Sequence, residues 1–138
     1  VLWITGLQPV EVSAFMENRG KPVDIDAVIN ARFRGGAVGS MNFVGSASRH
    51  DERLAIHGDK GTLVFHLHQW QVREVLMNGE ALQVPKRVVE DSPDAAWLRW
   101  MRNGGKGYER AEFAVQVAKF TEAAYRSVER GRSVKMTR

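Results

Sequence analysis

The sequence predicts an α+β domain in which helices pack on one face of an open, mainly antiparallel β-sheet. Two observations lead to this class. Through residues 24–65, apolar and polar side chains alternate with the period of two that is typical of half-buried strands. After Ser92 the apolar spacing changes to the three- and four-residue intervals of helices. Because strands and helices follow each other in separate blocks, the helices should cover one face of the sheet.

The strand block begins after a short helix end. Residues 1–4 read as the last turn of a helix that Gly6 stops, and residues 9–15 alternate as a first strand. Residues 24–65 then predict a four-strand meander with glycine-containing turns. An Asn-Gly pair at residues 78–79 separates two further apolar runs, and this pair is the strongest short signal for a β-hairpin.

The helical block holds two segments. Ser92, Pro93 and Asp94 supply an N-cap, a first-turn proline and an acid that matches the helix dipole. A longer helix is expected over residues 108–129, before a short strand at residues 133–136. One stripe of this helix, together with a tryptophan of the first segment, is expected to pack against the strands: Phe113, Val117, Phe120, Ala124, Val128 and Trp97.

The composition is that of an ordinary globular chain. Its 138 residues are 43% apolar and 26% charged, which fits a single domain over residues 1–138. The chain has no cysteine, which excludes disulfides and a cysteine nucleophile and fits a cytoplasmic location. No apolar run has the length of a membrane span, so no membrane partner is expected. Because the helix pattern is already ending at residues 1–4, we expect a piece of a longer protein.

The net charge of +4 is compatible with an anionic partner. The basic residues are, however, scattered over strands, loops and the C-terminal end. No zinc-finger, helix-turn-helix or RNA-binding signature accompanies them. A solvated basic surface, or attraction for a small anion, is therefore expected rather than a nucleic-acid groove.

Neither the histidines nor the glycine pairs predict a bound group. His66 and His68 share one face of a strand, but zinc needs at least a third protein ligand, so two exposed polar residues and no metal are expected. The glycine pairs at residues 35–36 and 104–105 match neither a P-loop nor the G-x-G-x-x-G pattern. The chain itself is therefore expected to bind no nucleotide cofactor.

The polar stretch at residues 46–53 is the strongest candidate for a substrate contact. It gathers Arg49, His50 and Arg53 at a strand exit, where arginines can clamp a carboxylate or a phosphate with two hydrogen bonds. The alternative is a solvated loop. Serine, histidine and aspartate all occur here, but no nucleophile elbow precedes either serine, so no catalytic triad is expected.

The order of these motifs resembles the C-terminal domain of the glucose–fructose oxidoreductase/inositol dehydrogenase (Gfo/Idh/MocA) family. The similarity covers nearly the whole chain, and no single motif is specific by itself. The segments that carry it are residues 2–6, 9–12, 34–39, 53–63 and 113–134.

The resemblance implies an NAD(P)-dependent sugar or polyol oxidoreductase. In that family a Rossmann domain holds the nicotinamide and carries a Glu-Lys-Pro motif, and a catalytic histidine precedes the region that corresponds to residues 1–4. This chain has no Glu-Lys-Pro motif, so the family's catalytic residues are carried over to no position of the sequence. The sheet does carry over, and in the family it forms one wall of the substrate pocket and a dimer interface.

We therefore expect the substrate-side and oligomerisation domain of an oxidoreductase, without its N-terminal Rossmann domain and inactive alone. The cofactor of the full-length protein would be NAD or NADP. The first alternative is a stand-alone β-sheet module for binding or dimerisation. A second, an anion- or nucleic-acid-binding surface, depends on charge alone.

Two sets of site residues follow from this hypothesis. Arg49, His50 and Arg53 are expected to contact the substrate, and no residue is expected to be catalytic or to bind a metal. The polar face of the first strands is expected to form the contact between two copies of the chain. Its residues mix valines with polar side chains, as an interface does: Val28, Asn30, Arg32, Val38, Ser40, Asn42 and Val44.

Overall fold

The computed structural model describes residues 2–69, 71–83, 92–104 and 110–136. Its strands are all antiparallel and form two sheets, with strand orders β3-β2-β1-β8 and β4-β5-β6-β7. The predicted class, α+β, is confirmed. The elements are α1 (Leu2–Thr5), β1 (Pro9–Glu17), β2 (Asp26–Phe33), β3 (Val38–Val44), β4 (Glu52–Gly58), β5 (Gly61–His68), β6 (Gln71–Met77), β7 (Glu80–Ala81), α2 (Pro93–Arg102), α3 (Arg110–Arg130) and β8 (Val134–Lys135).

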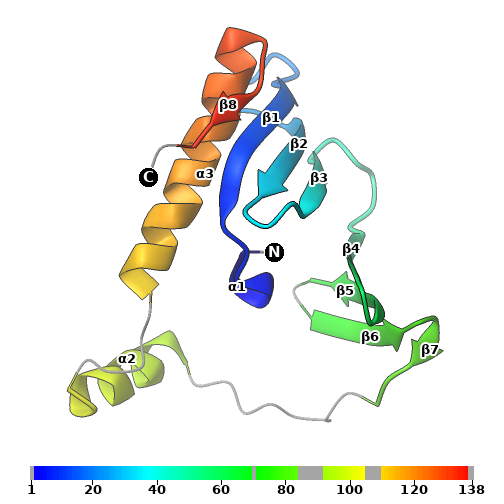
Figure 1. Cartoon of the computed structure of the whole chain (residues 1–138), viewed down its shortest axis with the longest axis vertical. Helices are drawn as coiled ribbons and strands as arrows, with labels where there is room; N and C mark the ends of the chain where they lie inside the picture. Colours follow the sequence, from blue (N-terminus) through cyan, green and yellow to red (C-terminus); the bar gives the residue numbers. More distant parts are fainter. Residues whose placement is uncertain (1, 70, 84–91, 105–109, 137–138) are drawn as a thin grey trace. The chain divides into compact units, whose positions relative to one another are not determined.

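The chain divides into two compact units. The first unit comprises Val1–Ser46 and Trp97–Arg138, and the second comprises Ala47–Ala96. In the first unit α3 lies along β1 and β8 and covers one face of the β3-β2-β1-β8 sheet (Figure 1). None of the helices in the described segments is both long and apolar enough to cross a membrane.

The core of the first unit lies between α3 and this sheet. The alternation in β1 and β2 turns every second side chain toward the helix, as the sequence predicted. The buried side chains that form the core are Val12, Ala14, Ile29, Ala31, Phe33, Phe120, Ala123, Ala124 and Val134. Leu2 and Leu7, on either side of the helix end at Gly6, pack against the edge of this cluster.

The predicted apolar stripe of α3 is partly wrong. Phe120 and Ala124 are buried as expected, but Val117 and Val128 are 39% and 38% exposed. The buried face includes Ser127 instead, which is 1% exposed. Small side chains on this face allow α3 to approach the sheet closely, whereas a stripe chosen by hydrophobicity favours the valines.

Ser127 completes the hydrogen bonding of the β1 edge. Strand β8 pairs with β1 at two positions, opposite Glu11 and Val12. Beyond this short pairing, the Ala14 N–H donates to Ser127 Oγ over 3.0 Å, and the Ser127 hydroxyl donates to the Arg132 carbonyl over 2.8 Å. A buried side chain therefore replaces a strand partner and joins the C-terminal end of α3 to the sheet.

The expected four-strand meander is wrong at one connection, because β3 and β4 belong to different sheets. The chain that leaves β3 is bound to the start of β2 instead. The N–H and hydroxyl of Ser46 donate to Asp26 Oδ1 over 3.1 and 2.8 Å, and the Gly45 N–H donates to the Ile25 carbonyl over 2.9 Å. A Cβ at position 45 would lie 2.6 Å from that carbonyl oxygen, so glycine is required at this close approach.

The second unit is a meander of β4, β5, β6 and the short β7, with Val64 and Val75 buried. The predicted Asn-Gly hairpin is confirmed. Asn78 and Gly79 have φ values of 54° and 89°, which are the left-handed conformations of a type I′ turn. The Asn78 side chain also accepts the Thr62 N–H over 2.8 Å and so connects two turns of this sheet.

The predicted start of α2 is confirmed, since Ser92 Oγ accepts the Ala95 N–H over 3.2 Å. The expected packing of Trp97 in the sheet core is wrong. Trp97 is 49% exposed, and its ring packs at a tilt of 38° against that of Trp100 in the same helix, with centroids 4.7 Å apart. Leu98 and Met101 of the same predicted face are also about half exposed.

Candidate functional site

The residues predicted to form an interface lie together on one face of the first unit's sheet. We call the face of β1, β2 and β3 opposite α3 the outer face. The register places Arg32 opposite Val38, Asn30 opposite Ser40 and Val28 opposite Asn42, so these side chains project in rows. All members of the predicted set are exposed: Val28, Asn30, Arg32, Val38, Ser40, Asn42 and Val44.

Strand β1 extends the outer face with residues that the sequence analysis did not include. Glu11, Ser13 and Phe15 pair with Arg32, Asn30 and Val28 and therefore share their face. Phe15 is 74% exposed, as is Val38. The signal was present in the sequence, since the odd positions of β1 alternate with its buried ones. What was missing was the pairing of β1 beside β2.

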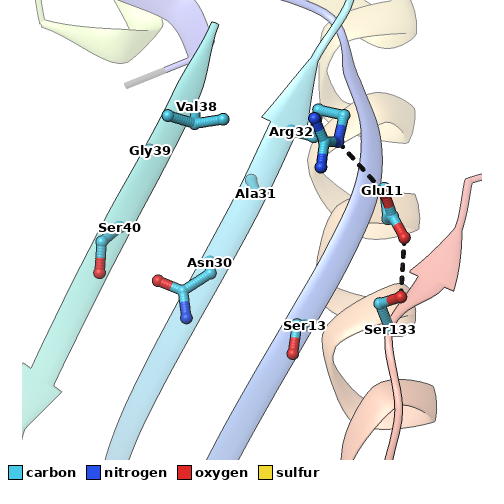
Figure 2. Close-up of a pocket in the computed structure, with 9 residues that line it drawn as sticks. All are labelled: Glu11, Ser13, Asn30, Ala31, Arg32, Val38, Gly39, Ser40 and Ser133. Atoms are coloured by element: carbon cyan, nitrogen blue, oxygen red, sulfur yellow. Dashed lines mark hydrogen bonds and ion pairs between the residues drawn. The ribbon is translucent and has the colours of Figure 1, made fainter. Parts of the chain in front are cut away.

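A shallow concavity of about 530 Å³ lies on the outer face. Ser13, Asn30 and Ser40 form a polar row across β1, β2 and β3 (Figure 2). Glu11, Arg32 and Ser133 border the row beside β8. The concavity is therefore lined by hydroxyl and amide groups, by one pair of opposite charges and by the apolar residues Ala31 and Val38.

Glu11 is held by two hydrogen bonds at this border. Ser133 Oγ donates to Glu11 Oε1 over 2.7 Å, and Arg32 Nε donates to Glu11 Oε2 over 3.3 Å. The hydrogen bond from Ser133, and then that from Arg32, lowers the pKa of Glu11 below its usual value. Glu11 is therefore a carboxylate throughout the neutral pH range. The outer face thus carries a pair of opposite charges, Glu11 and Arg32, at these pH values.

The outer face combines exposed apolar side chains with polar ones. Exposed valines and a phenylalanine alternate with amides and hydroxyls, which can be covered by another protein surface when their hydrogen bonds are matched. Within the segments that the structure describes, no group of three or more histidine, aspartate or glutamate side chains could hold a metal ion.

The predicted substrate contacts belong to the second unit. Arg49 and His50 precede β4, Arg53 lies within it, and all three are exposed. His50 Nε2 lies 3.2 Å from Glu52 Oε1, and the His50 ring meets that of His68 edge-on at 5.7 Å.

The structure therefore gives His50 two neighbours that the sequence analysis did not pair with it. Among the described residues, Arg49 and Arg53 make no ion pair. Their guanidinium groups keep their donors available for an anionic or hydroxyl-rich ligand.

The glycine turn between β2 and β3 lacks the features of a pyrophosphate site. Gly35 and Gly36 have the positive φ values of a tight turn, but the turn joins two antiparallel strands. A pyrophosphate is bound where a glycine-rich turn opens a helix, so that the helix N-terminus faces the phosphates. This turn lacks that helix and offers no such site.

Comparison with known families confirms the resemblance found in the sequence. The model of the GFO/IDH/MocA C-terminal domain matches residues 1–64. This range contains β1, β2 and β3, and hence most of the outer face. The comparison with curated protein sequences found no match.

Solved oxidoreductase structures share the fold. An aldose–aldose oxidoreductase from Caulobacter crescentus, complexed with glycerol, is 21% identical, with a TM-score of 0.78 over 98% of this chain and 43% of its own. The WlbA dehydrogenase from Bordetella pertussis, in complex with NADH and UDP-GlcNAcA, is 18% identical, with a TM-score of 0.71 over 99% of this chain and 41% of its own.

A levoglucosan dehydrogenase, in complex with NADH and levoglucosan, is 20% identical, with a TM-score of 0.69 over 95% of this chain and 46% of its own. The chain thus spans less than half the length of each of these proteins.

Proposed function

We propose that residues 1–138 act as the substrate-side and oligomerisation domain of an NAD(P)-dependent oxidoreductase for sugars or polyols. The observation that carries this proposal is the family match over residues 1–64, which includes three strands of a sheet that has one helix-covered face and one exposed face. The proposed hydride transfer takes place in a larger protein, whose Rossmann domain binds the cofactor. This chain alone transfers no hydride.

The similar structures support the proposed cofactor and substrate class. Two of them are complexes with NADH, and one is an aldose–aldose oxidoreductase. Levoglucosan and the UDP-linked ligand UDP-GlcNAcA occupy the two NADH complexes. In such an enzyme the cofactor supplies the hydride chemistry, and the domain proposed here contributes substrate contacts and assembly.

The outer face is the proposed contact between two copies. Val28, Val38 and Val44 are 39%, 74% and 60% exposed, and Phe15 beside them is 74% exposed. A solvated sheet face normally carries polar side chains in these positions, whereas a two-fold interface combines apolar groups with matched polar ones. We infer a homodimer or a higher oligomer of two-fold symmetry.

Val28→Lys is expected to dissociate the proposed dimer. Val28 lies on the central strand of the outer face, and its register partners Phe15 and Asn42 carry no charge that could pair with a lysine. Two copies would then place ammonium groups in a desolvated contact. Light scattering at tens of micromolar should give a dimer for the wild-type chain and a monomer for the variant.

Val115→Lys is the matched control, because Val115 is an exposed valine of α3, which covers the opposite face of the sheet. This variant should remain dimeric. A monomeric wild-type chain, or equal dissociation by both substitutions, would count against the proposed interface.

Arg49 is the proposed substrate contact with the clearest test. It makes no ion pair among the described residues, so its removal breaks no internal contact of this kind. In the full-length enzyme Arg49→Ala should raise KM about tenfold and change kcat little, because ground-state and transition-state binding are lost together. Steady-state kinetics with Arg53→Ala and His50→Ala in parallel would test the set, and unchanged KM in all three variants would contradict it.

A further inference from the structure

We propose that Glu11 and Arg32 recognise the second copy of the chain by exchanging partners: the Arg32 guanidinium of each copy binds the Glu11 carboxylate of the other. The inference rests on the proposed use of the outer face as an interface, and it specifies the chemistry that aligns the two copies. In the proposed dimer, the Glu11–Arg32 pair of each chain forms half of a cluster of four charges.

The pair within one chain leaves most of the Arg32 donors unused. Arg32 contacts Glu11 through Nε alone, over 3.3 Å, and its side chain is 62% exposed. Its two terminal nitrogens point away from Glu11 (Figure 2). They make no hydrogen bond or ion pair with any residue that the structure describes. A guanidinium has five N–H donors in a fixed fork, so four remain available.

When a second copy covers the outer face, the unpaired Arg32 N–H donors weaken association unless that copy supplies hydrogen-bond acceptors. A cation that loses water without gaining hydrogen bonds strongly opposes association. The polar row of Ser13, Asn30 and Ser40 offers only neutral groups. A carboxylate is the acceptor that a guanidinium fork binds best, because both terminal nitrogens can donate in parallel.

Glu11 is the carboxylate of the outer face that is placed to accept them. Asp26 already accepts from Ser46 and pairs with Arg19 over 2.8 Å. Glu17 accepts the Arg19 N–H over 2.9 Å, but its register partner is Asp26, at the other end of β2 from Arg32. Glu11 is the register partner of Arg32; it accepts one bond on each oxygen, and every carboxylate oxygen has a further lone pair.

Two-fold symmetry makes the exchange reciprocal. Glu11 and Arg32 are direct register partners on adjacent strands. A two-fold axis between them places each residue opposite the other residue of the second copy, so that both new contacts join opposite charges. A displaced alignment would bring like charges together, and the pair therefore selects the register of the two sheets as well as stabilising their contact.

Charge reversal in separate chains tests the exchange. Glu11→Arg gives a chain with two cations at this place, and Arg32→Glu gives a chain with two anions. Each variant alone should dimerise at least about tenfold more weakly than the wild type in sedimentation equilibrium, because two-fold symmetry then opposes like charges. An equimolar mixture should recover dimers, since every contact across the interface again joins opposite charges. Lys135 is the register partner of Glu11, and its positive charge adds to the repulsion in the homodimer of Glu11→Arg.

Recovery on mixing supports the exchange, because a pair confined to one chain cannot be restored by a second chain. Failure to recover, with folded variants, overturns the exchange. If either charge-reversed chain does not fold, the neutral variants Glu11→Gln and Arg32→Gln are tested in its place. The exchange requires each neutral variant to weaken dimerisation and to reduce the salt dependence of dimerisation. Unchanged affinity and unchanged salt dependence overturn the exchange.

The outcomes separate this inference from the proposed function. A dimeric wild type that Val28→Lys dissociates, but that neither charge reversal weakens, overturns the exchange and leaves the interface in place. A wild type that stays monomeric overturns both.

Discussion

Replacing Phe120 with alanine is expected to lower the free energy of unfolding of the first unit by about 3–5 kcal/mol. Phe120 is 7% exposed and belongs to the core cluster between α3 and the sheet. The substitution removes an aromatic ring and leaves a cavity among the side chains of this cluster. Urea unfolding followed by circular dichroism, at one fixed protein concentration, measures the loss.

Val117→Ala is the informative control for this prediction. Val117 lies on the same helix and also belongs to the stripe that the sequence predicted, but it is 39% exposed. Its replacement should cost less than about 1 kcal/mol. Similar losses for the two variants would mean that α3 presents a different face to the sheet.

Ser127→Ala should lower the free energy of unfolding by about 2 kcal/mol, although it removes a single oxygen atom. The hydroxyl is 1% exposed, accepts the Ala14 N–H and donates to the Arg132 carbonyl. Without it the Ala14 N–H is buried with no acceptor, and an unsatisfied buried donor costs about 1–3 kcal/mol. The same urea titration measures this effect.

Thr121→Ala provides the comparison on the same helix. The Thr121 hydroxyl is exposed and donates to the Val117 carbonyl over 3.1 Å, so water can replace it. This variant should change the free energy of unfolding by no more than about 0.5 kcal/mol. A loss for Ser127→Ala as small as that for Thr121→Ala would contradict the role assigned to Ser127 at the β1 edge.

The strands could be predicted well because their period is short and their faces differ. In β2 the alternation of Ala27, Ile29 and Ala31 with Val28 and Asn30 leaves two orientations of the strand. Only one of them buries the consistently apolar set. The predicted interface residues therefore emerged on one face, although nothing in the sequence showed that β1 would lie beside β2.

The position of α3 in the sequence could be predicted, but not the face that it turns toward the sheet. A period of 3.6 residues places several overlapping stripes on α3, and hydrophobicity favoured the stripe with Val117 and Val128. The structure buries Ala123 and Ser127 instead. The determining contact joins Ser127 to Ala14, 113 positions apart in the chain, and no local pattern contains it.

The division of the strands into two sheets could also not be predicted from a local sequence pattern. Residues on both sides of the β3–β4 connection predict strands, so no local pattern indicates that pairing stops there. The contact that directs the chain at this point joins Ser46 to Asp26, 20 positions earlier. For the candidate site the consequence is direct: the predicted interface residues and the predicted substrate residues lie in different units.

Chemical cross-linking is the most direct test of the central claim, that the outer face joins two copies of the chain. The sequence has no cysteine, so single thiols can be introduced without background: Ser13→Cys, Asn30→Cys and Asn42→Cys on the outer face, and Glu122→Cys on α3 as the control. A bifunctional thiol reagent that spans sheets packed about 10 Å apart should yield covalent dimers from at least one outer-face variant and none above background from Glu122→Cys. Cross-linking at Glu122 alone, or at none of the outer-face positions, would contradict the claim.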